Sequence, residues 1–486
     1  MGMGMFLGID LGTSGVKAIL VDAHQRVLAE GHAALQVNRP HPGWSEQNPD
    51  DWIAACETAV NQVRQAVPLE FSGLAAIGVS GQMHGATLLD AQDRPLRQCI
   101  LWNDGRAAEE CAELEARADF RGIGGNIVMA GFTAPKLAWV ARHEPEILAA
   151  TCKILLPKDY VNLWLTGDYV SDMSDASGTL WLDVRNRRWS DELLQATGLN
   201  ISQVPRLVEG SEPAGFLRAE LAQRWGVGKV TVAGGAGDNA ATACGLGVLQ
   251  PGQGFLSLGT SGVLFCATDR FLPNTGQAVH AFCHALPDSW HQMGVILSAT
   301  DSLNWLAGIA GQSPAALSRM VSQDAQGPAP AIFLPYLSGE RTPHNAPDMA
   351  GAFVGLRRDH GLPEIVHAVM DGVAFAFADC ADALRQGGSC PEDVWVAGGG
   401  SRSRRWLEII SACTGLRLMI PATGEKGAAL GAARLAQWST GMLPDTTDKA
   451  DAPVETIEAD PEMRHRYQAR LADFRRLAGV GRRASV

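Results

Sequence analysis

The sequence lacks several features that would assign it to particular classes of protein. No uncharged apolar run approaches the roughly 18 residues that a membrane-spanning helix needs, and the first residues do not resemble an export signal. The ten cysteines are widely spaced and include no Cys-x-x-Cys pair. This spacing is typical of reduced thiols and not of a disulfide framework. We therefore expect a cytoplasmic protein without a membrane partner.

Positive charge is also in short supply. The 40 lysines and arginines are outnumbered by 52 aspartates and glutamates, giving a formal net charge of -12. Such a surface should repel nucleic-acid backbones, so we expect no nucleic-acid partner. Hydrophobic residues make up 46% of the 486 residues, which is enough for sizeable cores and excludes disorder as the main state. The length predicts two or three folded units, at about 150 residues each.

Glycine, by contrast, is abundant, with 54 residues, and its placement is informative. The hexapeptide Leu-Gly-Thr-Ser-Gly-Val occurs at residues 11–16 and again at 258–263, 247 positions later, which is close to half of the chain. Strand-forming residues flank each copy, so each is predicted to be a strand-turn-strand hairpin. Neither a P-loop nor a Rossmann fingerprint occurs. Two similar lobes, each with one hairpin, are the simplest interpretation.

Each hairpin tip has the composition of an anion-binding loop. Backbone N–H groups beside glycines, together with Thr and Ser hydroxyls, can donate several hydrogen bonds to phosphate oxygens. A single copy would fit an ordinary tight turn equally well, but the duplication favours two tips that clamp one polyphosphate. Asp10 alternates out of an apolar strand just before the first tip, where its carboxylate would hold a hydrated Mg²⁺.

Two further glycine clusters each join an apolar strand to a helix. In the first, residues 234–239, Asp238 stands at the loop-to-helix junction. Such an aspartate can be a simple helix N-cap, but in a two-lobed protein it would lie in the cleft and could accept a proton from an attacking hydroxyl. In the second, residues 398–403, small side chains would let a flat adenosine ring approach the backbone. The alternative there is an ordinary strand-helix turn.

Strands and helices alternate along the whole chain, which predicts an α/β fold. Amphipathic helices are predicted over residues 51–67, 144–152, 363–384 and 404–413, and short apolar strands over 73–79, 230–233 and 394–397. A last helix should begin at Pro461. Its apolar stripe consists of Met463, Tyr467, Leu471, Phe474 and Leu477.

Taken together, these motifs resemble those of the FGGY carbohydrate kinases. Residues 8–14 and 256–262 are similar to the two phosphate motifs of that family, and residues 398–403 to its adenosine motif. Residues 131–143 and 351–371 are similar to its two signature segments. The resemblance spans residues 8–436.

The resemblance implies an α/β fold of two actin-like ATPase (ribonuclease H-like) lobes around a central cleft. Residues 1–245 would form the N-terminal lobe, with the sugar site and the first phosphate hairpin. Residues 246–440 would form the C-terminal lobe, with the second hairpin and the adenosine site. Residues 441–486 would form a C-terminal helix, and a homodimer is expected from the resemblance only.

The resemblance also implies the roles of individual residues in an ATP- and Mg²⁺-dependent kinase. Segments 80–85 and 101–106 are similar to those of family members that phosphorylate D-xylulose at O5. Asp238 would be the base, and Asp10 and Asp238 would hold the metal. The implied sugar-binding residues are Met83, His84, Asn103, Asp104, Arg106 and Asn239. The implied nucleotide-binding residues are Asp10, Gly12, Thr13, Ser14, Lys17, Gly259, Thr260, Ser261, Gly399, Gly400 and Ser403.

Several alternatives stay open at this point. Another ketose or polyol, such as ribulose or a sugar alcohol, could be the substrate, and His84 alone could be an ordinary core histidine. The same fold serves chaperone ATPases and filament proteins, but the residues after 440 do not resemble their added peptide-binding domain. A cluster of His280, Cys283, His284 and His291 has a spacing unlike that of known zinc sites.

Overall fold

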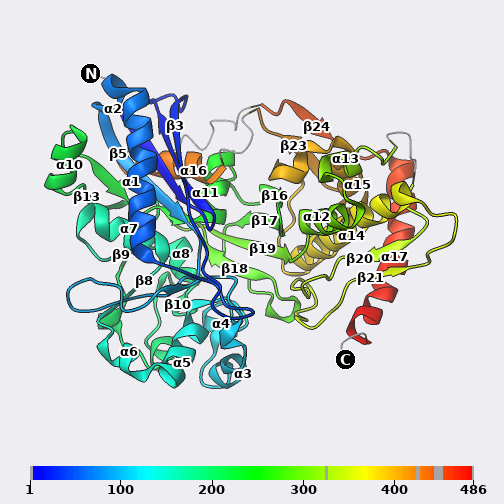
Figure 1. Cartoon of the computed structure of the whole chain (residues 1–486), viewed down its shortest axis with the longest axis horizontal. Coiled ribbons are helices and arrows are strands. Elements are labelled where there is room, and N and C mark those ends of the chain that lie inside the picture. The colour runs from blue at the N-terminus through cyan, green and yellow to red at the C-terminus, as the bar shows by residue number, and fades with distance from the viewer. Residues whose placement is uncertain (1–3, 323–326, 423–426, 443–451, 484–486) are drawn as a thin grey trace.

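The computed structural model describes residues 4–322, 327–422, 427–442 and 452–483. Two seven-stranded sheets, one from each half of the sequence, lie in separate lobes (Figure 1). The first sheet has the order β13-β14-β5-β1-β2-β3, with β15 also paired to β5. Its strands are β1 (Met5–Leu11), β2 (Gly15–Val21), β3 (Val27–Ala34), β5 (Leu74–Gly81), β13 (Pro213–Phe216), β14 (Thr231–Ala233) and β15 (Ala236–Gly237).

The second sheet repeats the central arrangement of the first. Its order is β18-β19-β17-β16-β22-β23-β24. In the first sheet β1 and β2 form an antiparallel hairpin, and β5 pairs with β1 in parallel. In the second sheet β16 and β17 form the hairpin, and β22 pairs with β16 in parallel. The prediction of two similar lobes from the repeated hexapeptide is therefore confirmed. The strands are β16 (Gly254–Leu258), β17 (Gly262–Thr268), β18 (His280–Cys283), β19 (Trp290–Ile296), β22 (Asp393–Ala397), β23 (Arg417–Ile420) and β24 (Glu455–Ile457).

Helices cover the first sheet and fill the part of its lobe that lies at the bottom of Figure 1. Helix α1 (Pro49–Ala66) buries Trp52, Cys56 and Val60 against the strands, as its predicted amphipathic pattern requires. The other helices of this half are α2 (Pro68–Phe71), α3 (Glu110–Glu115), α4 (Phe120–Ile123), α5 (Thr133–His143), α6 (Pro145–Ala150), α7 (Pro157–Thr166), α8 (Met173–Ser177), α9 (Asp191–Ala196), α10 (Ala219–Trp225) and α11 (Asp238–Leu246).

Short two-stranded pairs complete both lobes. They are β4 (Glu46–Gln47) with β7 (Cys99–Ile100), β6 (Thr87–Leu89) with β8 (Lys153–Leu155), β9 (Val170–Asp172) with β12 (Arg206–Val208), β10 (Leu182–Asp183) with β11 (Arg188–Trp189), and β20 (Ile332–Leu334) with β21 (Ala352–Val354).

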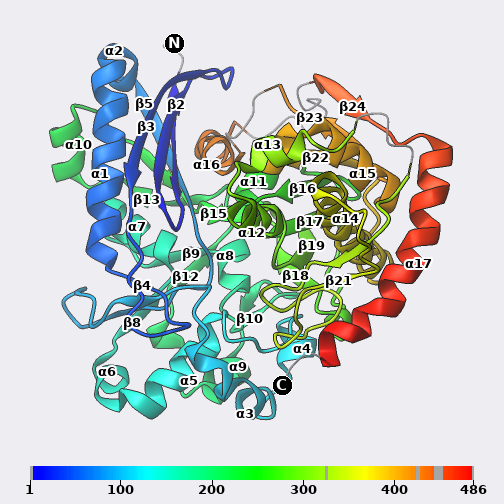
Figure 2. The ribbon, with the colours of Figure 1, turned by 45° about the vertical axis from the view of Figure 1, so that its right-hand side comes forward.

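The second lobe has the largest hydrophobic cluster of the molecule. It surrounds α14 (Leu362–Gln386), α15 (Arg404–Thr414) and the last helix, α17 (Pro461–Arg483). Helix α17 begins at the predicted Pro461 and runs along the outer flank of the lobe (Figure 2). The predicted stripe packs on this cluster, with Tyr467 and Phe474 fully buried. The remaining helices are α12 (Thr300–Ala310), α13 (Pro314–Ser318) and α16 (Gly427–Trp438).

Helix α16 belongs to the second half of the sequence but packs on the first sheet and on α11 (Figures 1 and 2). Glycines make this close approach of backbones possible. A Cβ added at Gly8 of β1 would lie 2.1 Å from Ala429 O, and one at Gly431 of α16 would lie 1.7 Å from Ala241 O on α11. Neither neighbour is the movable end of a side chain.

We expect Gly431→Ala to destabilise the protein by about 3 kcal/mol, the upper end of the range for overpacked cores, because the new methyl group meets a backbone carbonyl. The matched control is Gly479→Ala on α17, where a Cβ would lie in open space. That substitution should be neutral or stabilise by up to about 1 kcal/mol, since alanine favours a helix. Urea unfolding of both variants checks this, and equal midpoints would contradict the proposed contact.

Candidate active site

The site is built where three parallel strands of the first sheet end together. Asp10 of β1 is in register with Ser80 of β5, and Ser80 with Ala236 of β15. The Ser80 hydroxyl donates to Asp10 Oδ1 at 2.6 Å. Burial raises the pKa of Asp10, while this hydrogen bond and the charge of Lys17 across the hairpin lower it. Chain segments that leave these strands therefore converge beside the Asp10 carboxylate.

Asp238 begins α11 one residue after β15. The structure makes Gly237 the N-cap and Asp238 the first helical residue, so the N-cap interpretation of Asp238 is wrong. Its Oδ1 accepts from Asn239 N at 2.7 Å and from Asn239 Nδ2 at 2.9 Å. Burial, and then the charge of Asp10, raise the pKa of Asp238 to about 6. The two carboxylates are thus close enough to feel each other's charge.

Met83 and His84 follow β5 and lie next to the Asp238 loop. A Cβ at Gly237 would meet Met83 Cγ at 2.8 Å. His84 has a left-handed backbone with φ of 70°. Its carbonyl accepts from Lys136 Nζ at 2.8 Å and from Thr133 Oγ1 at 3.1 Å. These two donors from α5 hold the backbone of His84 in place.

The tautomer of His84 follows from its partner. Its Nδ1 lies 2.8 Å from Gly178 O, and because a carbonyl only accepts, Nδ1 must carry the proton. Burial, and then the charge of Lys136, lower the pKa of His84 to about 3. The ring is therefore neutral at physiological pH, and its Nε2 can accept a hydrogen bond.

The first hairpin tip is held by polar side chains from three separate segments. Thr13 Oγ1 donates to Gln82 Oε1 at 2.8 Å and accepts from Trp102 Nε1 at 3.0 Å, and Thr13 O accepts from Gln47 Nε2 at 2.8 Å. Ser14 is exposed at the tip. No group among the described residues accepts from the main-chain N–H of Thr13 or Ser14. The tip is rigid and retains open donors.

The second tip is anchored by the start of α12. Gly259 O accepts from Thr300 N at 2.9 Å and from Thr300 Oγ1 at 2.8 Å, and Thr260 O accepts from Ala299 N at 2.9 Å. Within the described part of the chain, the main-chain N–H groups of Thr260 and Ser261 also have no acceptor. Both predicted phosphate loops thus have main-chain N–H groups that can donate to a ligand.

The glycine cluster of residues 398–403 lies directly against the second hairpin tip. Gly398 has φ of +85°, and a Cβ at Gly400 would lie 2.4 Å from Leu258 Cγ. Gly399 is exposed, with open space beside it. Ser403 is the N-cap of α15 and shares a 2.7 Å hydrogen bond with Ser318 Oγ. Its hydroxyl is therefore already engaged, whereas Gly399 and Gly400 leave a flat surface.

Asp104 and Arg106 point inward from the loop that exposes Asn103. Arg106 pairs with Asp104 through Nη2 at 2.7 Å and with Glu46 through Nη1 at 2.7 Å. Its guanidinium lies 3.6 Å from the centroid of the Trp44 ring. Since both predicted side chains are almost fully buried, they anchor the loop here, and sugar contacts by them stay a prediction.

A buried charge cluster behind the Asp238 loop was not predicted. Lys158 Nζ lies 2.6 Å from Asp159 and 3.0 Å from Asp172, and donates to Gly234 O at 3.2 Å. Ser174 Oγ donates to Asp172 at 2.5 Å and accepts from the backbone N–H that precedes Asp238 at 3.2 Å. The signal was present in the sequence, because a lysine-aspartate pair interrupts an apolar segment there.

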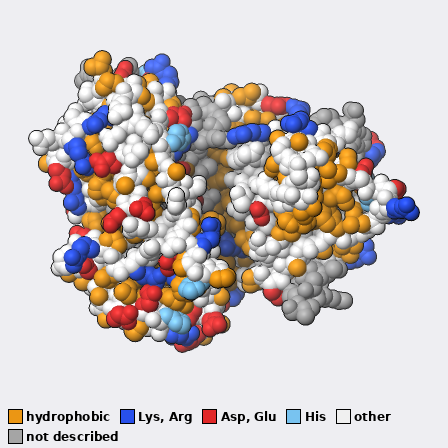
Figure 3. All heavy atoms as spheres, viewed as in Figure 1, with side chains coloured by type: hydrophobic (Ala, Val, Ile, Leu, Met, Phe, Trp, Pro, Cys, Tyr) orange, Lys and Arg blue, Asp and Glu red, His pale blue; other side chains and the backbone are white. Residues whose placement is uncertain are grey.

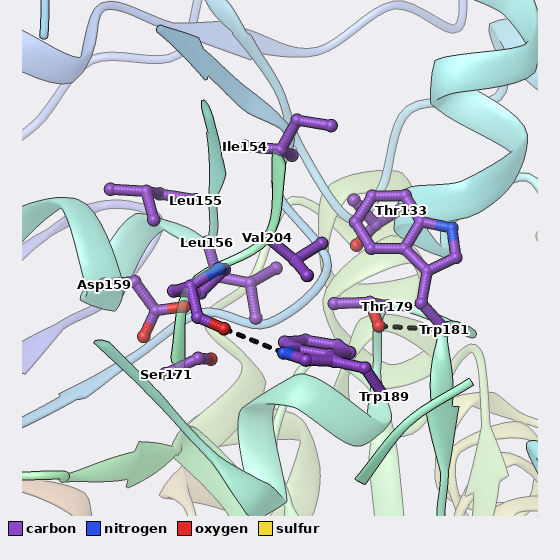
Figure 4. A pocket seen from close by; sticks show the side chains of 11 residues that line it. Thr133, Ile154, Leu155, Leu156, Asp159, Ser171, Thr179, Trp181, Trp189 and Val204 are labelled. Atoms are coloured by element: carbon purple, nitrogen blue, oxygen red, sulfur yellow. Dashed lines mark hydrogen bonds between the residues drawn. The ribbon is translucent and has the colours of Figure 1, made fainter. Parts of the chain in front are cut away.

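A small void adjoins this cluster (Figure 4). Asp159 and Ser171 line one side of it, and Trp181 and Trp189 the other. Its volume, about 10 Å³, is close to the minimum for a single water molecule. It is therefore too small to bind a sugar. A larger hollow lies between the two lobes on the face that Figure 3 shows.

The histidine cluster serves packing. His291 stacks on Phe265 with ring centroids 4.3 Å apart, and His280 stacks on Phe282 at 5.4 Å. In the described ranges, no three His, Cys, Asp or Glu residues are arranged to hold a metal ion. No described helix is long and apolar enough to cross a membrane. All ten cysteines, each within the described residues, are unpaired.

Comparison with known proteins decides the family. The N-terminal domain model of the FGGY family of carbohydrate kinases matches residues 5–245, and its C-terminal domain model matches residues 254–440. The chain belongs to the FGGY carbohydrate kinases. This FGGY kinase is 49% identical over 477 residues to the xylulose kinase of Escherichia coli strain K12, covering 97% of this chain and 98% of the relative.

Solved structures agree with the fold described above. A crystal structure of a xylulose kinase from Brucella ovis has a TM-score of 0.95 and 53% identity, covering 98% of this chain and 99% of that one. The Plasmodium falciparum glycerol kinase with ADP has a TM-score of 0.90 at 18% identity, covering 99% and 98%, and supports the fold alone. The predicted two-lobed α/β fold is confirmed.

Proposed function

We propose that this FGGY kinase transfers the γ-phosphoryl group of ATP to O5 of D-xylulose, giving D-xylulose 5-phosphate and ADP. The observation that carries the proposal is the surroundings of Asp238, which directly follows the Gly237 backbone that lies against Met83 and whose pKa is raised by the charge of Asp10. The identity of 49% to a xylulose kinase over almost the full chain supports the same substrate.

The ketose would bind on the N-terminal lobe. A sugar needs fixed donors and acceptors, because a site built to bond hydroxyls rejects analogues that lack them. His84 Nε2 offers an acceptor, Asn239 and Asn103 offer amides, and Met83 offers an apolar wall. Asp104 and Arg106 would act through the loop that they anchor.

The two hairpin tips would hold the phosphates of ATP. The open N–H groups of Thr13, Ser14, Thr260 and Ser261 are suited to phosphate oxygens. Gly12 and Gly259 open these turns, and Lys17 adds positive charge beside Asp10. The purine would lie against Gly399 and Gly400, near the second tip.

Asp10 and Asp238 fit a divalent cation. Both side chains are partly buried, and their negative charges repel each other. A cation between the two carboxylates and the phosphates would relieve this repulsion. Mg²⁺ is usually held by one or two carboxylates together with substrate phosphates. When bound, it would neutralise charge that develops on the transferred group.

Asp238 would remove the proton of the O5 hydroxyl as O5 attacks the γ-phosphorus. Its Oδ1 is fixed by Asn239, which leaves Oδ2 to receive the proton. The bond from phosphorus to the β,γ-bridging oxygen breaks, ADP leaves, and the proton passes from Asp238 to solvent. Closure of the lobes would exclude water and favour transfer to the sugar.

Coupled ADP release with Mg²⁺-ATP tests the substrate assignment. D-xylulose should be preferred over D-ribulose, L-ribulose, L-xylulose and glycerol, with little release in a no-sugar control. Preference for another ketose or polyol would keep the mechanism and overturn the substrate. ADP release at the same rate with every sugar and without sugar would contradict a sugar kinase.

We further propose that the enzyme works in the cytoplasm, where its unpaired cysteines stay reduced, and that it forms a homodimer.

The neutral state of His84 has a measurable consequence. Since its pKa is lowered to about 3, the ring does not titrate near the usual value of about 6.5. Any change in the KM for D-xylulose between pH 5.5 and 8 should therefore come from Asp238 or Lys136, whose pKa values are about 6 and about 7, and should persist in His84→Asn. His84→Asn, which keeps an amide acceptor, should raise this KM with little change in the KM for ATP. A step in KM near pH 6.5 that is present in the wild type and absent from His84→Asn would contradict the assignment.

A further inference from the structure

Arg341 has no role in the mechanism above, although it lies at the junction of the two lobes. It belongs to the segment between β20 and β21 of the C-terminal lobe. Its Nη1 lies 3.4 Å from His280 Nε2 on β18. The His280 ring contacts Phe132, which in turn contacts His84, so the guanidinium lies on the His84 side of the site, and its charge contributes to lowering the pKa of His84.

The guanidinium of Arg341 forms no close ion pair within the described part of the chain. Among the described residues, no carboxylate lies within 4.0 Å of it, whereas Arg106 and Arg187 are each paired with glutamate at 2.7 Å or less. The charge of the neighbouring Glu340 acts on Arg341, but its Oε1 accepts from Leu297 N at 3.0 Å and from the main-chain Arg341 N at 2.8 Å and forms no ion pair with the guanidinium. Burying a cation without an ion-pair partner costs free energy. Such a group is suited to hydrogen-bond acceptors of a bound ligand.

His280 accepts only one of the hydrogen bonds that Arg341 can donate. Asn126 Nδ2 donates to Gly124 O and Ala281 O, so Asn126 Oδ1 is an acceptor and His280 Nδ1 donates to it at 2.9 Å. His280 Nε2 is therefore the acceptor that faces Arg341. A guanidinium has five N–H donors, which leaves the rest available for a ligand.

The backbone beside Arg341 is fixed. Thr342 N donates to Val295 O at 3.0 Å, and Thr342 Oγ1 accepts from Val295 N at 3.0 Å. The same hydroxyl donates to Ala278 O at 2.9 Å. The C-terminal lobe thus holds Arg341 in position without the help of a ligand.

The surroundings of Arg341 indicate which end of the sugar it faces. Phe132 bridges the two histidines, with ring centroids 4.6 Å from His84 and 5.5 Å from His280. Asp238, in contrast, is influenced chiefly by burial and by Asp10. If O5 lies at Asp238, the other end of the ketose, with O1 and the C2 carbonyl, extends toward His84 and Arg341.

We propose that Arg341 is a sugar-binding residue supplied by the C-terminal lobe, whose guanidinium donates hydrogen bonds to O1 and to the C2 carbonyl oxygen of the ketose. This inference rests on the proposed function. Both oxygens can accept, and a guanidinium can bond two neighbouring acceptors at once. A contact from the second lobe also couples sugar binding to closure of the cleft.

The test is the kinetics of Arg341→Gln and Arg341→Lys with D-xylulose and with 1-deoxy-D-xylulose, which lacks O1. Losing charged hydrogen bonds should lower kcat/KM for D-xylulose roughly 10- to 100-fold in Arg341→Gln, with the KM for ATP unchanged. Arg341→Lys should recover part of the loss. The loss should be smaller with 1-deoxy-D-xylulose, because one of the two acceptors is already absent.

The control is Arg357→Gln, the same substitution at an exposed arginine of the same lobe, which should behave as wild type. Unchanged D-xylulose kinetics in Arg341→Gln would overturn the inference. So would an equal loss with both sugars, or a fall in melting temperature in both Arg341 variants with the KM for ATP raised in parallel. The wild-type rate with D-xylulose tests the proposed function separately, and its absence would overturn both.

Discussion

Asp238→Asn is expected to lower kcat by about 10²- to 10⁴-fold, the usual contribution of a positioned base. The asparagine side chain has the same shape and can keep the contact with Asn239 through its carbonyl oxygen, but it cannot accept the proton of O5. Binding of ATP without Mg²⁺ should change only a few-fold, because the hairpin tips are unaffected. Coupled ADP release gives kcat, and equilibrium titration gives the affinity for ATP.

The matched control for this variant is Asp191→Asn. Asp191 is also the first residue of a helix, α9, and is exposed. Any effect of removing a carboxylate from a helix N-terminus should therefore appear in both variants. Turnover within threefold of wild type in Asp238→Asn would remove Asp238 from the chemistry.

Lys158→Met should destabilise the protein by about 3–5 kcal/mol, the usual cost of removing one partner from a buried ion pair. Lys158 is fully buried, and its ammonium lies between Asp159 and Asp172. Both oxygens of the nearby Asp175 lack a hydrogen-bond partner among the described residues. Without the lysine, only negative charge would remain in this region.

The loss should depend on pH in a defined direction. Burial raises the pKa of Asp159 and of Asp175, and removing the cation raises both further. These groups are protonated as pH falls, which removes the repulsion, so the deficit of Lys158→Met should be larger at pH 8 than at pH 5. Urea unfolding at both pH values measures it.

Lys229→Met is the control for Lys158→Met. Lys229 is exposed and lies 3.8 Å from the centroid of the Phe216 ring, so its loss should cost about 0.5–1 kcal/mol at either pH. A deficit in Lys158→Met as small as this control, or one that grows toward low pH, would contradict the charge cluster as described.

Features that depend on local chemistry could be predicted from the sequence. Glycine with Thr and Ser between strand-forming residues specifies a hairpin tip, and the repeat at half-length specified two lobes. The helix at Pro461 was predicted because both its start and its apolar stripe are local patterns. A common metal site for Asp10 and Asp238, in contrast, was implied by the family resemblance and not by a local pattern.

Features that depend on contacts between distant segments could not be predicted. Nothing in the amphipathic pattern of α16 tells which lobe it covers, and its contact with Gly8 appears only in the folded chain. Arg341 and His84 are 257 positions apart in the sequence. The resemblance implied a sugar-binding role for Arg106, which stays a prediction, but its contacts with Glu46 and Trp44 could not be read from the sequence.

The most direct test of the central claim is the position of the phosphate in the product. The enzyme, D-xylulose and Mg²⁺-ATP are incubated, and the product is examined by phosphorus NMR coupled to the protons of each carbon. The account predicts one phosphate ester coupled to the two protons on C5, with one ADP formed per ester. An ester on another oxygen, or ADP formed with free phosphate and no ester, would contradict it.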